Sequence, residues 1–354
     1  MVLQYRATRL RTTSLSSHLT IRPFFINGIL VVGSVVLFIA GVECTLRITG
    51  LQTVQPNPPQ IYQTSEDPRI SYELKPNLDR EPAYKAHVST DAHGFRLNAA
   101  QQSRTNNQQP VIVLLGDSVT FGYGVDNDET LAAQLEQLQP DHSVINAAVP
   151  GYSLTMEVAA YETKIAEMNP DAVVIVFFWN DLDGFLPGKL DEMGILRSHD
   201  WQPGQDDCMP ITEGILSIIP RQCWLNSHSA LYKAMKKIIN LRQSKTKQKV
   251  DRTPVVAEQE TVNAKHLEEY GRILRSFSRI LPERRFFVIW PDNNMHTATR
   301  PSLREAAEAN GFTVIDLYDL FGNTVETLPW DTVHPSPESI RKSAEYIAPF
   351  LNKP

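Results

Sequence analysis

Cysteine is scarce in this chain of 354 residues, with only three, at positions 44, 208 and 223. There is no Cys-x-x-Cys pair and no cluster of histidine with cysteine, the usual signatures of zinc sites and dithiol redox centres. The glycine-rich motifs that bind phosphate, Gly-x-x-x-x-Gly-Lys-Ser/Thr and Gly-x-Gly-x-x-Gly, are also absent. We therefore expect neither a metal nor a cofactor.

Basic residues do not outnumber acidic ones in this chain. The formal net charge is -6 at pH 7, so nucleic acid is not an expected partner. Hydrophobic residues make up 42% of the chain and charged residues 21%, which is typical of a globular fold with a sizeable core. There is no internal repeat, and the sequence assigns no oligomeric state.

Acidic residues are absent before position 24, where the charged residues are Arg6, Arg9, Arg11 and Arg22. An apolar run of 19 residues follows at 24–42, close to the roughly 20 residues that span a bilayer as a helix. We predict a single-pass transmembrane anchor there, with the basic residues 1–23 in the cytoplasm and the rest of the chain extracytoplasmic, in the periplasm or on the outer face.

A cleaved signal peptide is the alternative for this run. The run is longer than an ordinary signal-peptide core of about 7–15 residues, and no Ala-x-Ala-like cleavage site follows it. Cys44 also raises a lipoprotein alternative, although Glu43 before it fits poorly with cleavage after a small residue.

The rest of the chain divides by composition. Residues 43–110 are rich in Pro, Asn and Gln and are expected to form a linker or surface wrap, with DAHGFRLN (91–98) packing on the domain edge. Residues 111–354 are expected to form the main domain, interrupted by an insertion at about 184–262. The insertion contains Cys208 and Cys223, which we expect to pair in an oxidising compartment, two free thiols being the alternative. Its basic stretch at 231–249 is expected to be a solvated helix face, with a membrane-surface role as the alternative.

From residue 111 the pattern alternates between strand and helix. Apolar runs predict strands at 111–115, 143–149, 171–178, 284–290 and 312–317. Helical spacing predicts helices at 130–138, 155–168, 261–280, 301–311 and 339–351. Five strands with helical crossovers predict an α/β fold with a doubly wound parallel sheet.

Polar residues follow the predicted strands. Because the carboxyl ends of parallel strands meet at one edge of the sheet, Ser118, Gly151 and Asn180 are expected to lie together there with Asp331 and His334. A serine needs a base to become a nucleophile, and a carboxylate three residues before a histidine can orient that base. Backbone N–H groups and an asparagine amide can stabilise an oxyanion. Together these groups predict an acyl-transfer site.

Four sequence blocks carry this site in order: GDSVT, VINAAVPGYS, FFWND and DTVHP. They resemble those of the SGNH hydrolases, also called the GDSL lipase/esterase family, over roughly residues 111–350. The resemblance implies a flavodoxin-like three-layer fold, with Ser118 as nucleophile, His334 as base and Asp331 as its partner. It also implies an oxyanion hole made by Ser118, Gly151 and Asn180. One departure is Phe178, where the family usually has glycine, and we expect it to alter the shape of the pocket.

The predicted function is a serine esterase that acts on an O-acyl ester, expected to be O-acetyl, of a cell-envelope or exported glycan. An O-acyltransferase to a polysaccharide would use the same triad and is the first alternative. A catalytically inactive glycan-binding module is the second, disfavoured because no triad member is missing. A nucleophile-elbow hydrolase does not fit, because Thr120 occupies the last position of Gly-x-Ser-x-Gly.

Overall fold

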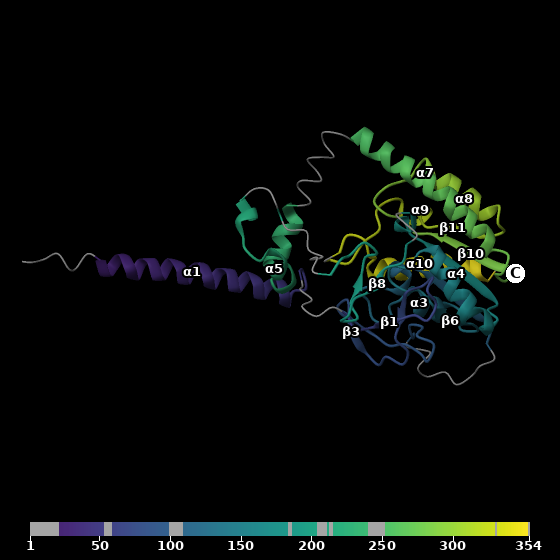
Figure 1. Cartoon of the computed structure of the whole chain (residues 1–354), viewed down its shortest axis with the longest axis horizontal. Helices are drawn as coiled ribbons and strands as arrows, with labels where there is room; N and C mark the ends of the chain where they lie inside the picture. Colours follow the sequence, from purple (N-terminus) through teal and green to yellow (C-terminus); the bar gives the residue numbers. More distant parts are fainter. Residues whose placement is uncertain are drawn as a thin grey trace, which may run out of the picture.

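A five-stranded parallel sheet forms the centre of the molecule (Figure 1). The computed structural model describes residues 21–52, 59–98, 109–182, 186–203, 211, 215–239, 252–329 and 331–352. The strands are β5 (Val111–Gly116), β6 (Ser143–Asn146), β7 (Ala172–Phe177), β10 (Arg284–Ile289) and β11 (Thr313–Asp316). Their spatial order is β11-β10-β7-β5-β6. Counted along the chain this is 2-1-3-4-5, the flavodoxin-like order, which confirms the predicted fold.

Two helical layers cover the sheet because its strands are apolar on both faces. Along β7, Val173, Ile175 and Phe177 pack in one core cluster, and the alternate residues pack in the other. One face is covered by α3 (Leu131–Leu138) and α10 (Pro337–Leu351), the other by α4 (Leu154–Ala160), α7 (Arg252–Phe277) and α8 (Thr299–Glu308). The short helices near the site are α2 (Ser118–Phe121), η4 (Trp179–Leu182) and α9 (Tyr318–Phe321), while η2 (Tyr161–Ile165) and η3 (Ala166–Met168) continue α4.

The entry into α10 is fixed immediately after the predicted catalytic histidine. Ser336 is the N-cap, and its side chain accepts a hydrogen bond from the Ser339 N–H at 3.2 Å. Pro337 occupies the first turn, where its ring matches helical geometry and its missing N–H costs nothing. The loop that carries His334 is therefore tied to a helix packed in the core.

The predicted linker or wrap is folded between residues 59 and 98. It contains two antiparallel hairpins, made of β1 (Tyr62–Thr64), β2 (Tyr72–Leu74), β3 (Glu81–Ala83) and β4 (Ala86–Val88). Apolar residues of both hairpins share a core cluster with Met156 and Ala159 of α4. This segment, hereafter the wrap, is thus part of the catalytic domain's packing.

Arg96 gives the end of the wrap a larger role than the predicted edge packing. Its side chain is buried. The guanidinium donates to the carbonyl oxygens of Phe121, Gly122 and Val125 at 2.9, 2.7 and 2.6 Å. Burial lowers the pKa of Arg96 to about 9, so it remains charged at neutral pH. Those carbonyls belong to the loop that follows Ser118, so Arg96 holds that loop in place.

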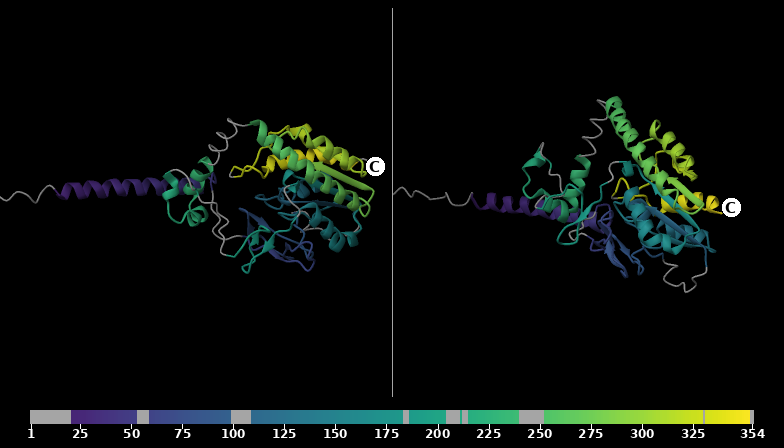
Figure 2. Two further views of the ribbon diagram at one scale, coloured as in Figure 1. Left: turned by 45° about the horizontal axis from the view of Figure 1, so that its top comes forward. Right: turned by 45° about the vertical axis from the view of Figure 1, so that its right-hand side comes forward.

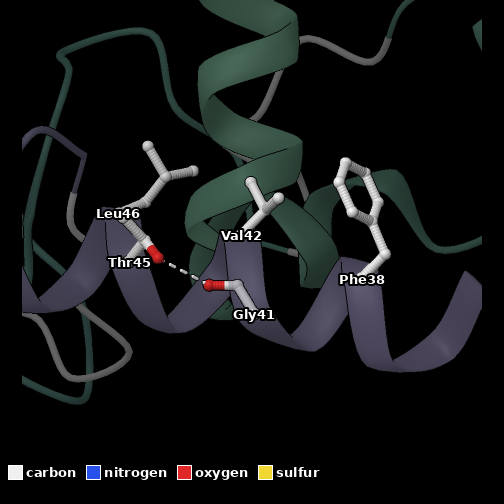
Figure 3. A pocket seen from close by; sticks show the side chains of 5 residues that line it. All are labelled: Phe38, Gly41, Val42, Thr45 and Leu46. Atoms are coloured by element: carbon white, nitrogen blue, oxygen red, sulfur yellow. Dashed lines mark hydrogen bonds between the residues drawn. The ribbon is translucent and has the colours of Figure 1, made fainter. Parts of the chain in front are cut away.

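Helix α1 (Ile21–Ile48) projects from the domain (Figures 1 and 2). Its stretch Phe25–Ile48 is long and apolar enough to cross a membrane, and it is exposed from residue 25 to residue 41. Side chains of α1 line a pocket of about 370 Å³ beside the ribbon of residues 215–239 (Figure 3). The lining residues are Phe38, Gly41, Val42, Thr45 and Leu46.

The predicted insertion differs from the structure at its carboxyl end. Helix α7 begins at Arg252, inside the expected insertion, because its polar first half continues a helix whose second half buries one apolar face. The described part of the insertion contains β8 (Lys189–Leu190), β9 (Leu196–Arg197), η5 (Ile215–Ile218), α5 (Gln222–His228) and a helix at 230–239. Cys223 is disulfide-bonded and Cys44 is free. Cys208, the expected partner of Cys223, lies outside the described residues.

Replacing Arg96 by alanine should destabilise the domain strongly. Three buried carbonyls would each lose a hydrogen bond from a charged donor, worth about 1.5–3 kcal/mol. We expect the free energy of unfolding, measured by urea denaturation, to fall by at least about 3 kcal/mol. Arg341→Ala is the control, because the exposed pair of Arg341 with Glu338 should contribute less than about 1 kcal/mol. Equal losses in the two variants would contradict this role.

Candidate active site

The turn after β5 presents Ser118 at the carboxyl edge of the sheet. Asp117 is the N-cap of α2, and its Oδ1 accepts from the Val119 N–H at 2.8 Å. A Cβ on Gly116 would lie 2.2 Å from Thr120 Oγ1, so only glycine fits so close to the first turn of α2. The site lies between the ends of β5 and β7, where the strand order reverses and ligands bind in this fold.

Ser118, His334 and Asp331 form a continuous hydrogen-bonded chain. His334 Nε2 lies 3.0 Å from Ser118 Oγ, and His334 Nδ1 lies 2.9 Å from Asp331 Oδ2. Asp331 Oδ1 also accepts the N–H groups of Val333 and His334 at 2.7 and 3.0 Å. The structure therefore brings together the three residues predicted as the triad.

The electrostatics of Asp331 set the state of the imidazole. Burial raises the pKa of Asp331, but hydrogen bonds from His334 and Val333 outweigh it and hold that pKa well below its usual range. The ionised carboxylate can only accept a hydrogen bond, so His334 carries a proton on Nδ1. Nε2 is then free to accept the Ser118 proton.

Two tyrosines pack in line with the His334 ring. Tyr123 stacks on His334 with ring centroids 3.9 Å apart, and Tyr84 stacks on Tyr123 at 4.1 Å. Tyr84 comes from the turn between β3 and β4, where it and Lys85 have φ angles of 55° and 71°. Residues other than glycine rarely adopt such positive φ angles, and backbone strain of this kind is concentrated at functional sites. Tyr84 was not predicted as part of the site, because a turn of ordinary residues carries no turn signal in the sequence.

The loop after β6 lies beside the serine turn. The Val149 N–H donates to the Gly116 carbonyl at 3.2 Å, and Gly151 has a φ of +81°. The Tyr72 hydroxyl donates to the Pro150 carbonyl at 2.9 Å, and a Cβ on Gly151 would lie 2.7 Å from that hydroxyl. Within the described part of the chain, the N–H groups of Ser118 and Gly151 make no hydrogen bond.

Asn180 follows β7 and is joined to the serine turn through a buried carboxylate. Its Nδ2 donates to Asp117 Oδ2 at 2.8 Å. This bond between Asn180 and Asp117 was not predicted from the sequence. Because an amide nitrogen carries two hydrogens, one can bond Asp117 while the other remains for a ligand. Asp117 is therefore a positioning residue for Asn180.

The model of the GDSL-like lipase/acylhydrolase family matches residues 114–341, a span that contains Ser118, Gly151, Asn180, Asp331 and His334. The chain belongs to this family. It is accordingly a serine ester hydrolase. No curated protein matches the chain.

Several solved structures are similar to this GDSL-like chain. TesA is 12% identical with a TM-score of 0.38, the match covering 68% of this chain and 98% of TesA. A lipase/acylhydrolase from Enterococcus faecalis is 16% identical with a TM-score of 0.40, covering 69% and 95%. An acetylxylan esterase from Geobacillus stearothermophilus is 14% identical with a TM-score of 0.36, also covering 69% and 95%.

Phe178 is the departure of this GDSL-like chain from the usual pattern of its family. Its side chain is buried in the same core cluster as Val119, Trp290 and Leu328. Its backbone N–H donates to Asp181 Oδ2 at 3.1 Å. The core below the carboxyl end of β7 thus accommodates the phenylalanine ring.

Among the described residues, no group of three His, Cys, Asp or Glu side chains is placed to hold a metal ion.

A second buried carboxylate, Glu157 of α4, interacts with Asp117. Burial and the charge of Asp117 raise the pKa of Glu157 to about 8. Burial also raises the pKa of Asp117, while hydrogen bonds from Asn180 and Val119 oppose that shift. Because Glu157 Oε2 has no hydrogen-bond partner among the described residues, Glu157 holds the proton at neutral pH. Asp117 then stays ionised and keeps its bond to Asn180.

Glu157→Gln should therefore stabilise the protein at high pH and change little at low pH. A carboxyl whose pKa is raised from about 4.3 in the unfolded chain costs stability increasingly as pH rises from there through about 8. We expect a Tm above that of wild type at pH 8, by about 2–4 °C for each kcal/mol of penalty removed, and nearly equal values at pH 4. Calorimetry at both pH values measures this.

The exposed Glu167→Gln is the matched control and should show no such trend. A Tm difference for Glu157→Gln that is the same at pH 4 and pH 8 would contradict the assignment of the proton to Glu157.

Proposed function

We propose that this protein is an esterase that works through an acyl-Ser118 intermediate. Ser118 Oγ attacks the acyl carbonyl as His334 Nε2 takes its proton, and His334 returns that proton to the leaving alcohol. A water molecule, deprotonated by His334, then attacks the acyl-enzyme and releases the acid and Ser118. The observation that carries this proposal is the unbroken chain from Ser118 through His334 to Asp331, with links of 3.0 and 2.9 Å.

The tetrahedral intermediate needs donors for its oxyanion. We assign this role to the N–H groups of Ser118 and Gly151 and to the free amide hydrogen of Asn180. Both backbone groups lack another partner in the described structure, and Asp117 holds the Asn180 amide at the serine turn. Such preorganised donors act where the charge develops and need no rearrangement during the reaction.

The proposed substrate is an O-acyl ester, in particular O-acetyl, of a cell-envelope or exported glycan. Helix α1 can cross a membrane, and the four arginines before its apolar run would keep residues 1–23 in the cytoplasm. The anchor would then occupy residues 24–42 and leave the catalytic domain, 111–354, outside. The disulfide at Cys223 suits such an oxidising compartment.

Ser118→Ala and His334→Ala should each remove nearly all turnover of a short-chain aryl ester. Because the two residues act as one unit, the double variant should be no worse than either single variant. Steady-state kinetics measure the loss, and circular dichroism checks that each variant is folded. Substantial turnover by folded Ser118→Ala would rule out this mechanism.

Adding an oligosaccharide acceptor to the wild-type assay distinguishes hydrolysis from acyl transfer, because transfer would yield acylated acceptor instead of free acid.

Asn180→Ala should lower kcat by about 10²–10³ with a much smaller change in KM, the usual result of removing one oxyanion donor. Asn180→Asp should be at least as impaired, because a second carboxylate would face Asp117 and the forming oxyanion. If Asn180 only caps the turn, Asn180→Ala should lose about 1 kcal/mol of stability with kcat nearly unchanged. Measuring Tm and kcat on the same sample decides between these roles.

A further inference from the structure

The helix at 230–239 begins on the anchor helix. Glu43 of α1 accepts the N–H groups of Ala230 and Leu231, each at 2.8 Å, and the Ser229 hydroxyl at 2.9 Å. Arg47 pairs with Glu43 at 2.6 Å and donates to the His228 carbonyl. A carboxylate on the first N–H groups of a helix stabilises its N-terminus. The anchor is therefore bound to the insertion and is not a free tether.

From Glu43 this helix leads toward the active site. In Figures 1 and 2 the loop before α10 extends from the sheet toward the insertion and lies beside it. Lys233 and Lys237 are four residues apart, so they share one face of the helix. The charge of Asp331 acts on Lys233, which places that lysine near the triad. The path from Ala230 to Lys237 is only about 10 Å at 1.5 Å per residue.

A third lysine reaches the same place from the wrap. Lys85 occupies the left-handed turn next to Tyr84, whose ring belongs to the stack on His334. Partial burial and the charges of Lys233 and Lys237 lower the pKa of Lys85 to about 7, while Asp331 opposes the shift. Two separate elements thus bring like charges together beside the site, at a cost in free energy that a bound anion would relieve.

We propose that Lys85, Lys233 and Lys237 form an anion-binding subsite at the mouth of the esterase site. The subsite takes a carboxylate or phosphate carried by the ester substrate. This inference rests on the proposed function and deepens it: the ester belongs to an acidic molecule close to the membrane. The anionic group comes either from an acidic saccharide or from a lipid headgroup, and both present the same chemistry to the lysines.

The test compares two esters that differ only in a carboxylate, O-acetylated methyl glucoside and O-acetylated methyl glucuronoside. The full-length protein is assayed in nanodiscs of phosphatidylcholine. Wild type should have the higher kcat/KM on the glucuronoside, and this preference should fall as salt is added. The double variant Lys233→Gln/Lys237→Gln should reduce the ratio of the two kcat/KM values about tenfold. Lys85→Gln should reduce the same ratio about fivefold, which corresponds to the upper end of the energies measured for exposed charge pairs. Lys342→Gln, which removes a lysine paired with Glu338 on α10, should keep the wild-type ratio.

Nanodiscs that contain phosphatidylglycerol distinguish the two sources of the anion. Slower turnover in them that depends on the three lysines supports a headgroup phosphate as the occupant. A ratio that falls in the lysine variants without any lipid effect supports an acidic saccharide. An unchanged ratio in every lysine variant, together with no lysine-dependent lipid effect, would overturn the subsite.

Failure of the proposed function would look different, because wild type would then hydrolyse neither ester. In that case binding of methyl glucuronoside and methyl glucoside, measured by ligand-observed NMR, tests the subsite alone. Binding of the glucuronoside that is lost in the lysine variants supports it, and equal binding of the two sugars overturns it.

Discussion

The contact between Ser118 Oγ and His334 Nε2 joins two residues that are 216 positions apart, and much of the fold serves to hold that contact. Ser118 stands at the end of the central strand β5, and His334 precedes the cap of α10. Both elements are packed in the same core cluster. The distance between the two reacting groups is therefore set by the core and not by the mobility of one loop.

Residues of the wrap hold the loops and rings of the active site in place. Arg96 holds the loop after the serine, Tyr72 holds the turn at Gly151, and Tyr84 supports Tyr123 on the histidine ring. Each of these side chains touches a different part of the site, yet all come from residues 59–98. Glu43 separately ties the insertion to α1. Helix α1 thus contacts the insertion, while the wrap holds the loops of the active site.

The sequence predicted the sheet and the triad because both depend on local patterns. The central strands β5 and β7 are apolar runs buried on both faces, and each block places its polar residue directly after a strand or beside α10. The hairpins of the wrap were missed because strands of three residues show no periodicity. The bond between Asn180 and Asp117 joins residues 63 positions apart, and no local pattern encodes it. The start of α7 was placed too late because residues 252–260 have few apolar positions to mark a helix face.

Covalent labelling of Ser118 tests the central claim most directly. A fluorophosphonate reacts with a serine only where a base and an oxyanion site activate it. The full-length protein is treated with the probe, digested, and analysed by mass spectrometry of its peptides. We expect one modified residue, Ser118. Modification at another serine, or a folded protein that remains unlabelled, would contradict the account.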